Sequence, residues 1–411
     1  MEAALNSGFF KENINMEEEK MSAKNWLALI GLACSAFIFN TSEFIPIGLL
    51  CGIAEDFGRT EAQTGMLISV YAWMVMLMSL PLTMLFSRTE LRKLLLSVIA
   101  FFTVFQGLSF LSTSYGMLMC ARIGVACTHA IFWSIIPTIA VRSVPGKFKD
   151  LALSIVVTGT SIAFIMGMPL GRAVGLLVGW RVTFLCIGIF ALLTLIFAFI
   201  ALPRIPAGNG VSLKGLPKML RNKVLLGIYL FTLLYAAGYY TAYSYIEPFL
   251  QQIGGMSESL ITTTLMIFGA AGLLGSYSFS TFYDRHRFRF VSLAMCGLIL
   301  ALALLMPSAR IHWIVIILCA VWGTAATAYN VAMQSEVIAT SSEDESTVAM
   351  SIYSGIFNLG IGTGAFTGGL VCTHLQLSWI GFAGALLAGA GLLFWQFRLS
   401  RLMKRQNRTL L

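Results

Sequence analysis

Twelve apolar stretches, each long enough to cross a bilayer, constrain this chain more than any other feature. About 20 mainly apolar residues in helical form span a hydrocarbon core of ~30 Å. Only 11% of the 411 residues are charged and 58% are hydrophobic, whereas about a quarter of a soluble domain is charged. The sequence therefore predicts an all-α membrane protein with twelve transmembrane helices. The expected spans are 26–50, 63–86, 94–112, 115–141, 151–178, 182–202, 224–250, 260–282, 290–306, 313–337, 348–373 and 379–397.

Basic residues are distributed unevenly between the two sides of the predicted membrane protein. If the amino terminus is cytoplasmic, the loops and tails on that side hold 22 of the 27 Lys and Arg residues. Cytoplasmic loops of membrane proteins carry such an excess, so both termini are expected to be cytoplasmic. The net charge of +9 then reflects topology, and no nucleic-acid partner is expected. One cytoplasmic loop, residues 341–345, is acidic, but acidic residues contribute little to topology.

Cysteine and histidine offer no pattern typical of a metal site. The eight cysteines all fall in apolar runs without Cys-x-x-Cys spacing, and the four histidines are scattered. Cysteines of this kind usually pack like small apolar residues. We expect no metal, cofactor or disulfide.

Corresponding residues recur at a fixed spacing, which predicts an internal duplication. Ser87-Arg88 and Asp284-Arg285 are 197 positions apart, as are Gly58 and Gly255. We expect two six-helix bundles, residues 25–202 and 224–400, arranged as parallel repeats with a substrate site between them near the membrane midplane. Residues 203–223 are expected to be a flexible cytoplasmic linker, 1–24 a disordered tail and 401–411 a second cytoplasmic tail. The true start is either Met1 or Met21.

The fourth predicted span carries Arg122, His129 and Trp133. At 100° per residue these side chains lie within about 20° of one line along the helix. A mid-membrane arginine costs at least ~2.5 kcal/mol and usually faces a partner or a watery cavity. The bland interpretation is an arginine that snorkels outward and a histidine satisfied by a neighbouring helix. The functional interpretation is one wall of a transport pathway.

The first predicted span carries Asn40 and Glu43, followed by Pro46. Counting ~1.5 Å per residue places Glu43 and Arg122 both about 10 Å inside the outer face, so we expect them to pair. The alternative is a carboxylate tilted outward at the interface, because Pro46 can end the helix early.

The seventh predicted span has Tyr239, Tyr240, Tyr243 and Glu247 within a stripe about 100° wide. Tyrosine belts at membrane interfaces are common, but these tyrosines extend over three turns, where phenol hydroxyls need polar partners. Such hydroxyls suit a polyhydroxylated ligand.

A substrate site can be composed from these helices. We expect Trp133 and Tyr243 to face each other from the two halves and to stack on the substrate, while Asn40 and Asn358 hydrogen-bond to its hydroxyls. In the fifth span, Gly167, Pro169 and Gly171 predict either ordinary close packing or a hinge or seal.

Four stretches carry a resemblance to a known family. Through these four stretches the chain resembles members of the major facilitator superfamily. Within the superfamily it resembles the drug:proton antiporter branch, and within that branch the bacterial sugar efflux transporters. The resemblance extends over residues 24–397. The stretches are 37–46, 129–134, 240–249 and 354–358.

The motifs of the superfamily match this chain unevenly. Its cytoplasmic loop motif falls on residues 83–92, where Ser87 stands at the usual aspartate and Glu90 at the second glycine, while Arg88 is kept. The second copy keeps Asp284 and Arg285, so the resemblance implies two cytoplasmic gates, of which the first is weaker.

Two further motifs concern proton transport. The arginine linked to proton coupling matches Arg122, and the antiporter motif of span five appears at Gly167–Gly171, shifted by one residue.

The resemblance implies proton-coupled efflux of sugars or related small solutes by a monomer in a bacterial inner membrane. Its partners are then the solute, protons and the lipid bilayer, with Glu43, Arg122, His129 and Glu247 as the proton-coupling residues. The alternative is a multidrug:proton antiporter that exports lipophilic or cationic compounds. A membrane enzyme or receptor is disfavoured because the sequence shows no catalytic carboxylate pair, nucleophile elbow or phosphate-binding loop.

Overall fold

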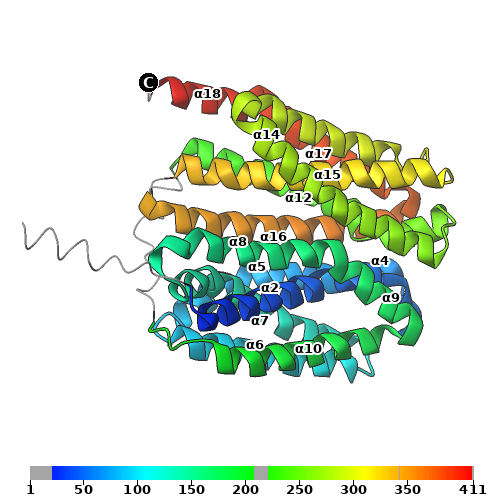
Figure 1. Ribbon diagram of the computed structural model, residues 1–411. Coiled ribbons are helices and arrows are strands. Elements are labelled where there is room, and N and C mark those ends of the chain that lie inside the picture. Colours follow the sequence, from blue (N-terminus) through cyan, green and yellow to red (C-terminus); the bar gives the residue numbers. More distant parts are fainter. Residues whose placement is uncertain (1–20, 208–220, 342, 410–411) are drawn as a thin grey trace, which may run out of the picture.

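The computed structural model describes residues 21–207, 221–341 and 343–409, in which every regular element is helical. The helices form two halves that lie side by side (Figure 1). The first half runs from α2 to α10 and the second from α12 to α18. Residues 1–20 of the expected tail and 208–220 of the expected linker lie outside the described residues, as does residue 342. Ala23 and Lys24, which were expected in the disordered tail, begin α2.

The first half contains α2 (Ala23–Gly48), α3 (Leu50–Asp56), α4 (Glu61–Thr64), α5 (Met66–Leu85), α6 (Leu91–Phe110), α7 (Tyr115–Arg142), α8 (Lys149–Ile162), the π-helical turn η2 (Ala163–Gly167), α9 (Met168–Val178) and α10 (Trp180–Ala201). The second half contains α12 (Lys223–Tyr243), α13 (Ile246–Pro248), the π-helical turn η4 (Phe249–Ile253), α14 (Glu258–Leu305), α15 (His312–Thr340), α16 (Glu343–His374), α17 (Ile380–Phe394), η6 (Trp395–Leu399) and α18 (Ser400–Thr409).

Eleven helical segments of the described chain are long and apolar enough to cross a membrane, where the sequence predicted twelve. The difference arises at α14, a 48-residue element that contains two predicted spans, 260–282 and 290–306. His286 interrupts α14 with non-helical backbone angles of φ −138° and ψ 36°. The expected tail at 401–411 is largely helical, because α18 extends to Thr409.

Polar caps fix where several helices begin. Ser22 accepts a hydrogen bond from the backbone N–H of Asn25 at the start of α2, and Ser114 does the same for Met117 at the start of α7. Such caps satisfy N–H groups that have no partner within the helix. Pro46, expected as a possible early end of the first span, lies inside α2, which continues to Gly48.

The two halves repeat local structure at the spacing found in the sequence. The Asn25 side chain donates to the Ser143 carbonyl at 2.6 Å, and Asn222, 197 positions later, donates to the Thr340 carbonyl at 3.4 Å. Gly58 and Gly255 both adopt positive φ, 59° and 62°, in the loop after the first long helix of each half. This left-handed conformation favours glycine.

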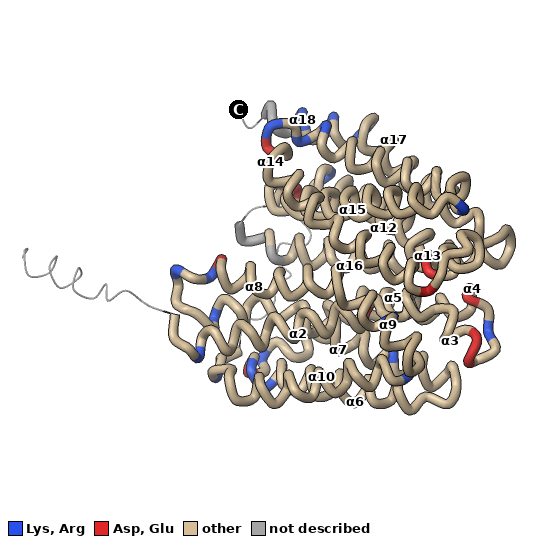
Figure 2. Tube along the Cα trace, turned by 45° about the vertical axis from the view of Figure 1, so that its right-hand side comes forward, with Lys and Arg blue, Asp and Glu red and all other residues tan. Residues whose placement is uncertain are grey.

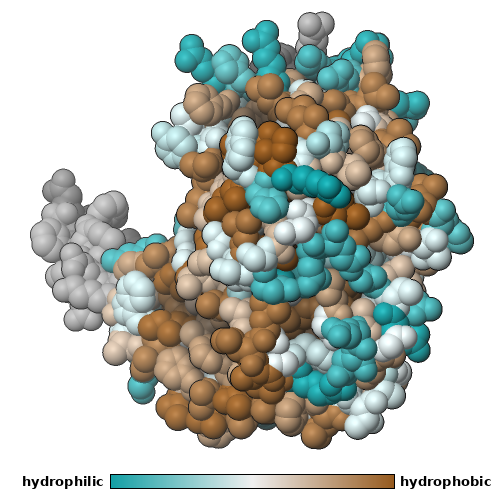
Figure 3. Space-filling model, turned by 90° about the vertical axis from the view of Figure 1, so that its right-hand side faces the viewer, coloured by the Kyte–Doolittle hydropathy of each residue, from teal (hydrophilic) through white to brown (hydrophobic). Residues whose placement is uncertain are grey.

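The two ends of the bundle differ. We call the end where α2 begins and α18 lies the terminal end, and the end with α3, α4 and α13 the opposite end (Figures 1 and 2). In the described residues, every hydrogen bond and ion pair that joins the halves lies toward the opposite end. Viewed from that end, hydrophilic residues extend over the middle and the right-hand side of the face, and apolar residues predominate at its lower left (Figure 3).

Candidate functional site

Arg122 lies in α7 with its guanidinium directed at the end of α2, and only 1% of the residue is exposed. Its Nη1 donates to the Ser42 carbonyl at 2.9 Å and to the Ser42 hydroxyl at 3.2 Å. Pro46 explains why this carbonyl is free, because a proline has no N–H to donate to the residue four positions earlier. The Ser42 carbonyl that Pro46 leaves free and the buried Arg122 guanidinium therefore provide each other with a hydrogen-bond partner.

Glu43 does not pair with Arg122 as the sequence predicted. Arg122 reaches only the backbone carbonyl of Glu43, at 3.4 Å. The Glu43 carboxylate instead lies 3.6 Å from Nε2 of His129, and the side chains of Glu43 and His129 are 9% and 4% exposed. Glu43 and Arg122 lie at the same level along their helices, as expected, but the direction of the Arg122 side chain follows the carbonyl that Pro46 frees.

Two neighbours of this cluster were missed in the sequence. The ring of Tyr71, from α5, lies 4.4 Å from the Arg122 guanidinium, and Gln106, from α6, donates to the Ser42 hydroxyl at 2.5 Å. Arg122 Nε, His129 Nδ1 and Gln106 Oε1 are buried without a protein partner. Buried polar atoms are nearly always satisfied by protein or by ordered water. These atoms of the cluster can therefore hydrogen-bond to water, and an acceptor among them can take up a proton.

Trp133 and Asn40 lie nearer the terminal end than Glu43. The Trp133 ring is 6.2 Å from the His129 ring, one turn along α7, and is partly buried. The Asn40 amide donates to the Ala36 carbonyl at 2.9 Å and contacts Thr160 at 3.4 Å.

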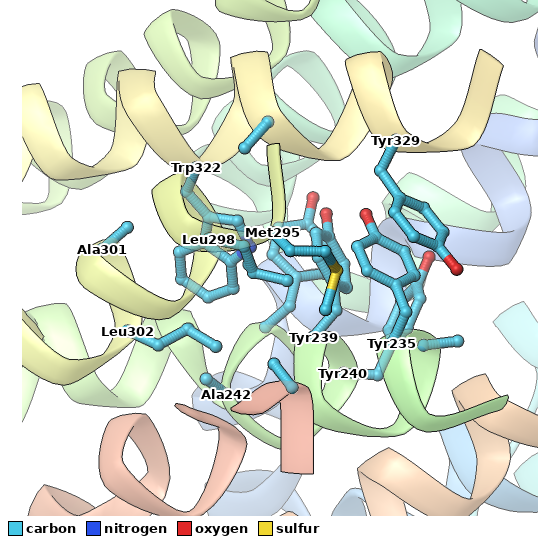
Figure 4. Close-up of a cluster of buried hydrophobic side chains, with 14 of the residues drawn as sticks. Tyr235, Tyr239, Tyr240, Ala242, Met295, Leu298, Ala301, Leu302, Trp322 and Tyr329 are labelled. Carbon is cyan, nitrogen blue, oxygen red and sulfur yellow. The ribbon is translucent and has the colours of Figure 1, made fainter. Parts of the chain in front are cut away.

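The tyrosines of α12 lie within an aromatic cluster of the second half (Figure 4). Tyr239 contacts Trp322 of α15 with ring centroids 5.5 Å apart, and Tyr243 stacks on Phe268 at 5.0 Å. The expected facing pair of Trp133 and Tyr243 is not formed. Tyr243 ends α12 near the opposite end, whereas Trp133 lies about 27 Å along α7 from the opposite-end start of that helix.

Besides Tyr243, whose hydroxyl lies 3.7 Å from Met168 Sδ, Tyr240 of α12 contacts the first half. It stacks against Phe44, the neighbour of Glu43, with centroids 6.4 Å apart. Asn358 of α16 donates to the Ser354 carbonyl at 3.0 Å and leaves its own Oδ1 buried without a partner. Glu43 and Tyr240 thus belong to the same region of the interface between the halves.

Arg172 of α9 connects the halves at the opposite end and is fully buried. It donates to the Glu258 carboxylate, to the Glu258 carbonyl at 2.9 Å and to the Thr262 hydroxyl at 2.8 Å, all from α14.

Glu247 completes this opposite-end clasp. Its carboxylate lies 3.5 Å from Arg172 and accepts a hydrogen bond from the Cys51 N–H at 3.0 Å. Arg172 was not among the residues that the sequence suggested for a site. The missed signal was its position among apolar residues and glycines, between Gly171 and Gly175.

The glycines of span five face α2 within the first half. A Cβ added to Gly167 would lie 2.2 Å from the Thr41 hydroxyl, and one added to Gly171 would lie 1.8 Å from the Ile45 side chain. Pro169 follows the π-helical turn, in the first turn of α9. This geometry supports the close-packing interpretation, and the hinge role stays a prediction.

The expected gate residues lie at the terminal end. Arg88 is exposed, and Glu90 forms an ion pair with Lys93 at 3.4 Å. Asp284 and Arg285 are exposed and make no ion pair within the described part of the chain.

A buried ion pair that the sequence did not indicate lies one turn away from Asp284. Arg287 binds the fully buried Glu336 of α15 with two hydrogen bonds of 2.5 Å, and the Tyr283 hydroxyl donates to the same carboxylate at 2.6 Å. This contact lies within the second half and fastens the interruption of α14 to α15.

Backbones of the two halves touch at Gly269, which allows a direct test of opposite-end closure. A Cβ there would lie 2.5 Å from the Phe164 carbonyl oxygen. Overpacking typically costs 1–3 kcal/mol, so Gly269→Ala is expected to shift the population toward a form open at the opposite end by about fivefold or more. Spin labels at Gly116 and Leu375, after replacement of the native cysteines, should report a longer distance.

Gly389→Ala is the matched control, because nothing lies within 4 Å of a Cβ at that position. An unchanged distance distribution in Gly269→Ala would show that the halves do not separate at this contact.

A family model described as Major Facilitator Superfamily matches residues 30–340. Solved transporter structures share the fold at low sequence identity. A bacterial homologue of the human lysosomal transporter Spinster, inward-facing and unoccupied, gives a TM-score of 0.76 at 16% identity over 92% of this chain and 97% of its own. A mutant of the nucleoside transporter NupG gives 0.70 at 14% identity over 90% and 98%. The human organic anion transporter MFSD10 gives 0.64 at 13% identity over 91% and 100%.

Proposed function

The chain belongs to the major facilitator superfamily, and from that premise we propose that it exports sugars or related small solutes in exchange for protons. Membership makes it a multi-pass membrane transporter of small solutes and not an enzyme. The proposed mechanism is alternating access, in which one site opens in turn to each side of the membrane.

The proposed topology has twelve spans in two parallel six-helix repeats. At 1.5 Å per residue, α14 is about 72 Å long, more than twice a ~30 Å hydrocarbon core, and its interruption at His286 divides it into two spans. The equivalent hydrogen bonds of Asn25 and Asn222 support the repeat.

We place the terminal end in the cytoplasm of a bacterial cell, at its inner membrane. Most Lys and Arg residues of the described chain lie at that end (Figure 2), as the positive-inside rule requires. The contacts between the halves at the opposite end then correspond to a transporter that is closed to the outside and accessible from the cytoplasm.

The observation that carries proton coupling is the buried Glu43 carboxylate, 3.6 Å from His129 and close to the contacts of Arg122. A carboxylate, an imidazole and an arginine in one nearly dry cluster form a site that can gain or lose a proton when water reaches it. Phe44 and Tyr240 bring this cluster to the interface between the halves, where alternating access changes exposure. For Glu247, which lies 3.5 Å from Arg172, we propose a role in closing the opposite end and not in proton transfer.

Sugar as the substrate class rests on the family resemblance and on the polar groups near the same interface. Asn358 Oδ1 is a buried acceptor without a partner, and Trp133 offers a partly buried ring one turn from His129. A site with buried polar groups discriminates against ligands that lack a matching hydroxyl.

Everted membrane vesicles with an acidified interior provide the test. A labelled sugar is expected to accumulate inside vesicles that contain the protein, and a protonophore should remove the accumulation. Vesicles without the protein are the control. Failure of every sugar in a panel of pentoses, hexoses and disaccharides would exclude the proposed substrate class.

The same vesicles decide the alternative, a multidrug:proton antiporter. The observation that favours it is the aromatic wall formed by Phe44, Phe164 and Tyr240, because apolar aromatic surfaces accept many lipophilic compounds. Accumulation of cationic dyes without any sugar would establish that function instead.

A further inference from the structure

A groove of about 410 Å³ opens on the outer surface of the second half at the terminal end. It lies between the part of α14 that follows His286 and the segment formed by η6 and α18. Phe288, Leu293 and Trp395 form its apolar part, and Arg289 and Lys404 are its basic residues. The transport site proposed above does not include any of these residues.

The two basic residues of the groove have no acidic partner among the described residues. Arg289 and Lys404 are exposed, and in the described chain neither forms an ion pair. The buried carboxylate of Glu336 in the same half already binds Arg287 and Tyr283. Lys404 lies 4.9 Å above the Phe288 ring, which holds its ammonium at the groove.

The apolar surface continues from the groove along the membrane-facing side of the second half. Leu293 is 71% exposed and Phe397 is 62% exposed, although both are large and apolar. Trp395 lies with its indole N–H donating to Ser292 at 3.1 Å, and tryptophans are typical of membrane interfaces. Cations beside an exposed apolar surface suit an anionic phospholipid. Its headgroup binds to the cations while its acyl chains cover the apolar side chains.

We propose that this groove binds the headgroup of an anionic phospholipid from the leaflet around the terminal end. Arg289 and Lys404 bind the phosphate, and Phe288 and Leu293 contact the first part of the acyl chains. The short helix α18 places Lys404 and Arg401 on its exposed side and buries Met403, which suits a helix that lies at a membrane surface.

The first half supplies an internal comparison. Its own groove, about 570 Å³, is lined by Lys93, Leu96 and Phe199, and Leu96 precedes Leu293 by 197 positions. The cation that lines it, Lys93, pairs with Glu90 at 3.4 Å, and the neighbouring Arg92 donates to the Phe199 carbonyl at 2.6 Å. The first groove should therefore discriminate less between anionic and zwitterionic lipids.

Native mass spectrometry of the purified full-length protein measures the bound lipid. The probes are dioleoyl phosphatidylglycerol, dioleoyl phosphatidylcholine with identical chains, and glycerol 1-phosphate. We expect preferential binding of phosphatidylglycerol. Because a basic residue near a membrane surface contributes ~1 kcal/mol, Arg289→Gln or Lys404→Gln should weaken that binding about fivefold, and the double variant about 30-fold.

Two controls keep this test specific. Lys93→Gln removes the cation of the first groove, and Lys24→Gln with Lys149→Gln removes two exposed cations outside both grooves; all three changes should leave the phosphatidylglycerol bound to the second groove in place. Equal binding of both lipids, or an equal loss in the Lys24 and Lys149 variant, would overturn the proposal. Equally tight binding of glycerol 1-phosphate would identify a site for soluble phosphate esters instead of lipid. Unchanged melting temperatures of the variants would show that a loss of lipid is not a loss of fold.

Discussion

Proteoliposomes that contain Glu43→Gln are expected to equilibrate the solute without concentrating it against a gradient. The accumulation ratio driven by a pH gradient should fall to about 1, while exchange of labelled for unlabelled solute continues. Glutamine keeps the size and hydrogen-bonding capacity of the side chain but cannot carry the proton. The change therefore removes coupling and leaves the pathway intact.

The geometry around Glu43 explains why this effect should be large. Its carboxylate lies 3.6 Å from His129, whereas Arg122 hydrogen-bonds to Ser42 and to the Glu43 backbone carbonyl. No second carboxylate within the described part of the cluster replaces it. Gradient-driven accumulation and counterflow, measured on the same proteoliposomes, separate coupling from transport.

Glu55→Gln is the matched control, because Glu55 is an exposed carboxylate at the opposite end and should behave like the parent. Normal accumulation by Glu43→Gln would refute the assignment and make His129 the next residue to test. Loss of both accumulation and counterflow would show that Glu43 positions the solute or the helices and does not act only in coupling.

Arg172→Gln is expected to destabilise the form that is closed at the opposite end by about 100-fold relative to the open form. Arg172 is fully buried and faces two carboxylates, of which Glu247 is 5% exposed and Glu258 is 44% exposed. Breaking a buried ion pair costs about 3–5 kcal/mol, since the remaining charge stays unpaired. The lower value applies here because water reaches Glu258.

Distances between spin labels at Gly116 and Leu375 would measure this shift. Arg181→Gln is the matched control: Arg181 pairs with Asp56 at the same end, but both side chains are about one third exposed and belong to the first half. A surface pair of this kind contributes ~0–1 kcal/mol. The second change Glu247→Gln, added to Arg172→Gln, should restore part of the closed population by removing the unpaired charge. An Arg172→Gln distance distribution equal to that of Arg181→Gln would contradict the clasp.

The sequence predicted the polar face of α7 because helical geometry alone determines it. Arg122, His129 and Trp133 repeat at angles that coincide whatever the surrounding structure is, and Tyr71 and Phe39 pack against that same face. The common level of Glu43 and Arg122 was likewise obtained by counting residues. The direction of the Arg122 side chain could not be obtained in this way, because its partner is the carbonyl that Pro46 leaves free in another helix.

The contacts between the two halves could not be predicted from the sequence. Arg172 and Glu258 are 86 positions apart, and no period or motif relates them. Aromatic residues posed a similar difficulty. The tyrosine stripe of α12 suggested a ligand, yet Tyr239 and Tyr243 mostly contact Trp322 and Phe268, since a stripe shows only that a helix face is buried and not what buries it.

The two hydrophobic cores differ in which parts of the sequence supply their residues. The core of the first half consists only of residues between Ala28 and Ile205. The core of the second half also includes residues of the first, among them Phe44, Ile68 and Met168. During synthesis the first bundle can therefore complete its packing while the ribosome is still translating the second. The second bundle is then completed against a surface that already exists, so the order of synthesis matches the order in which the cores become possible.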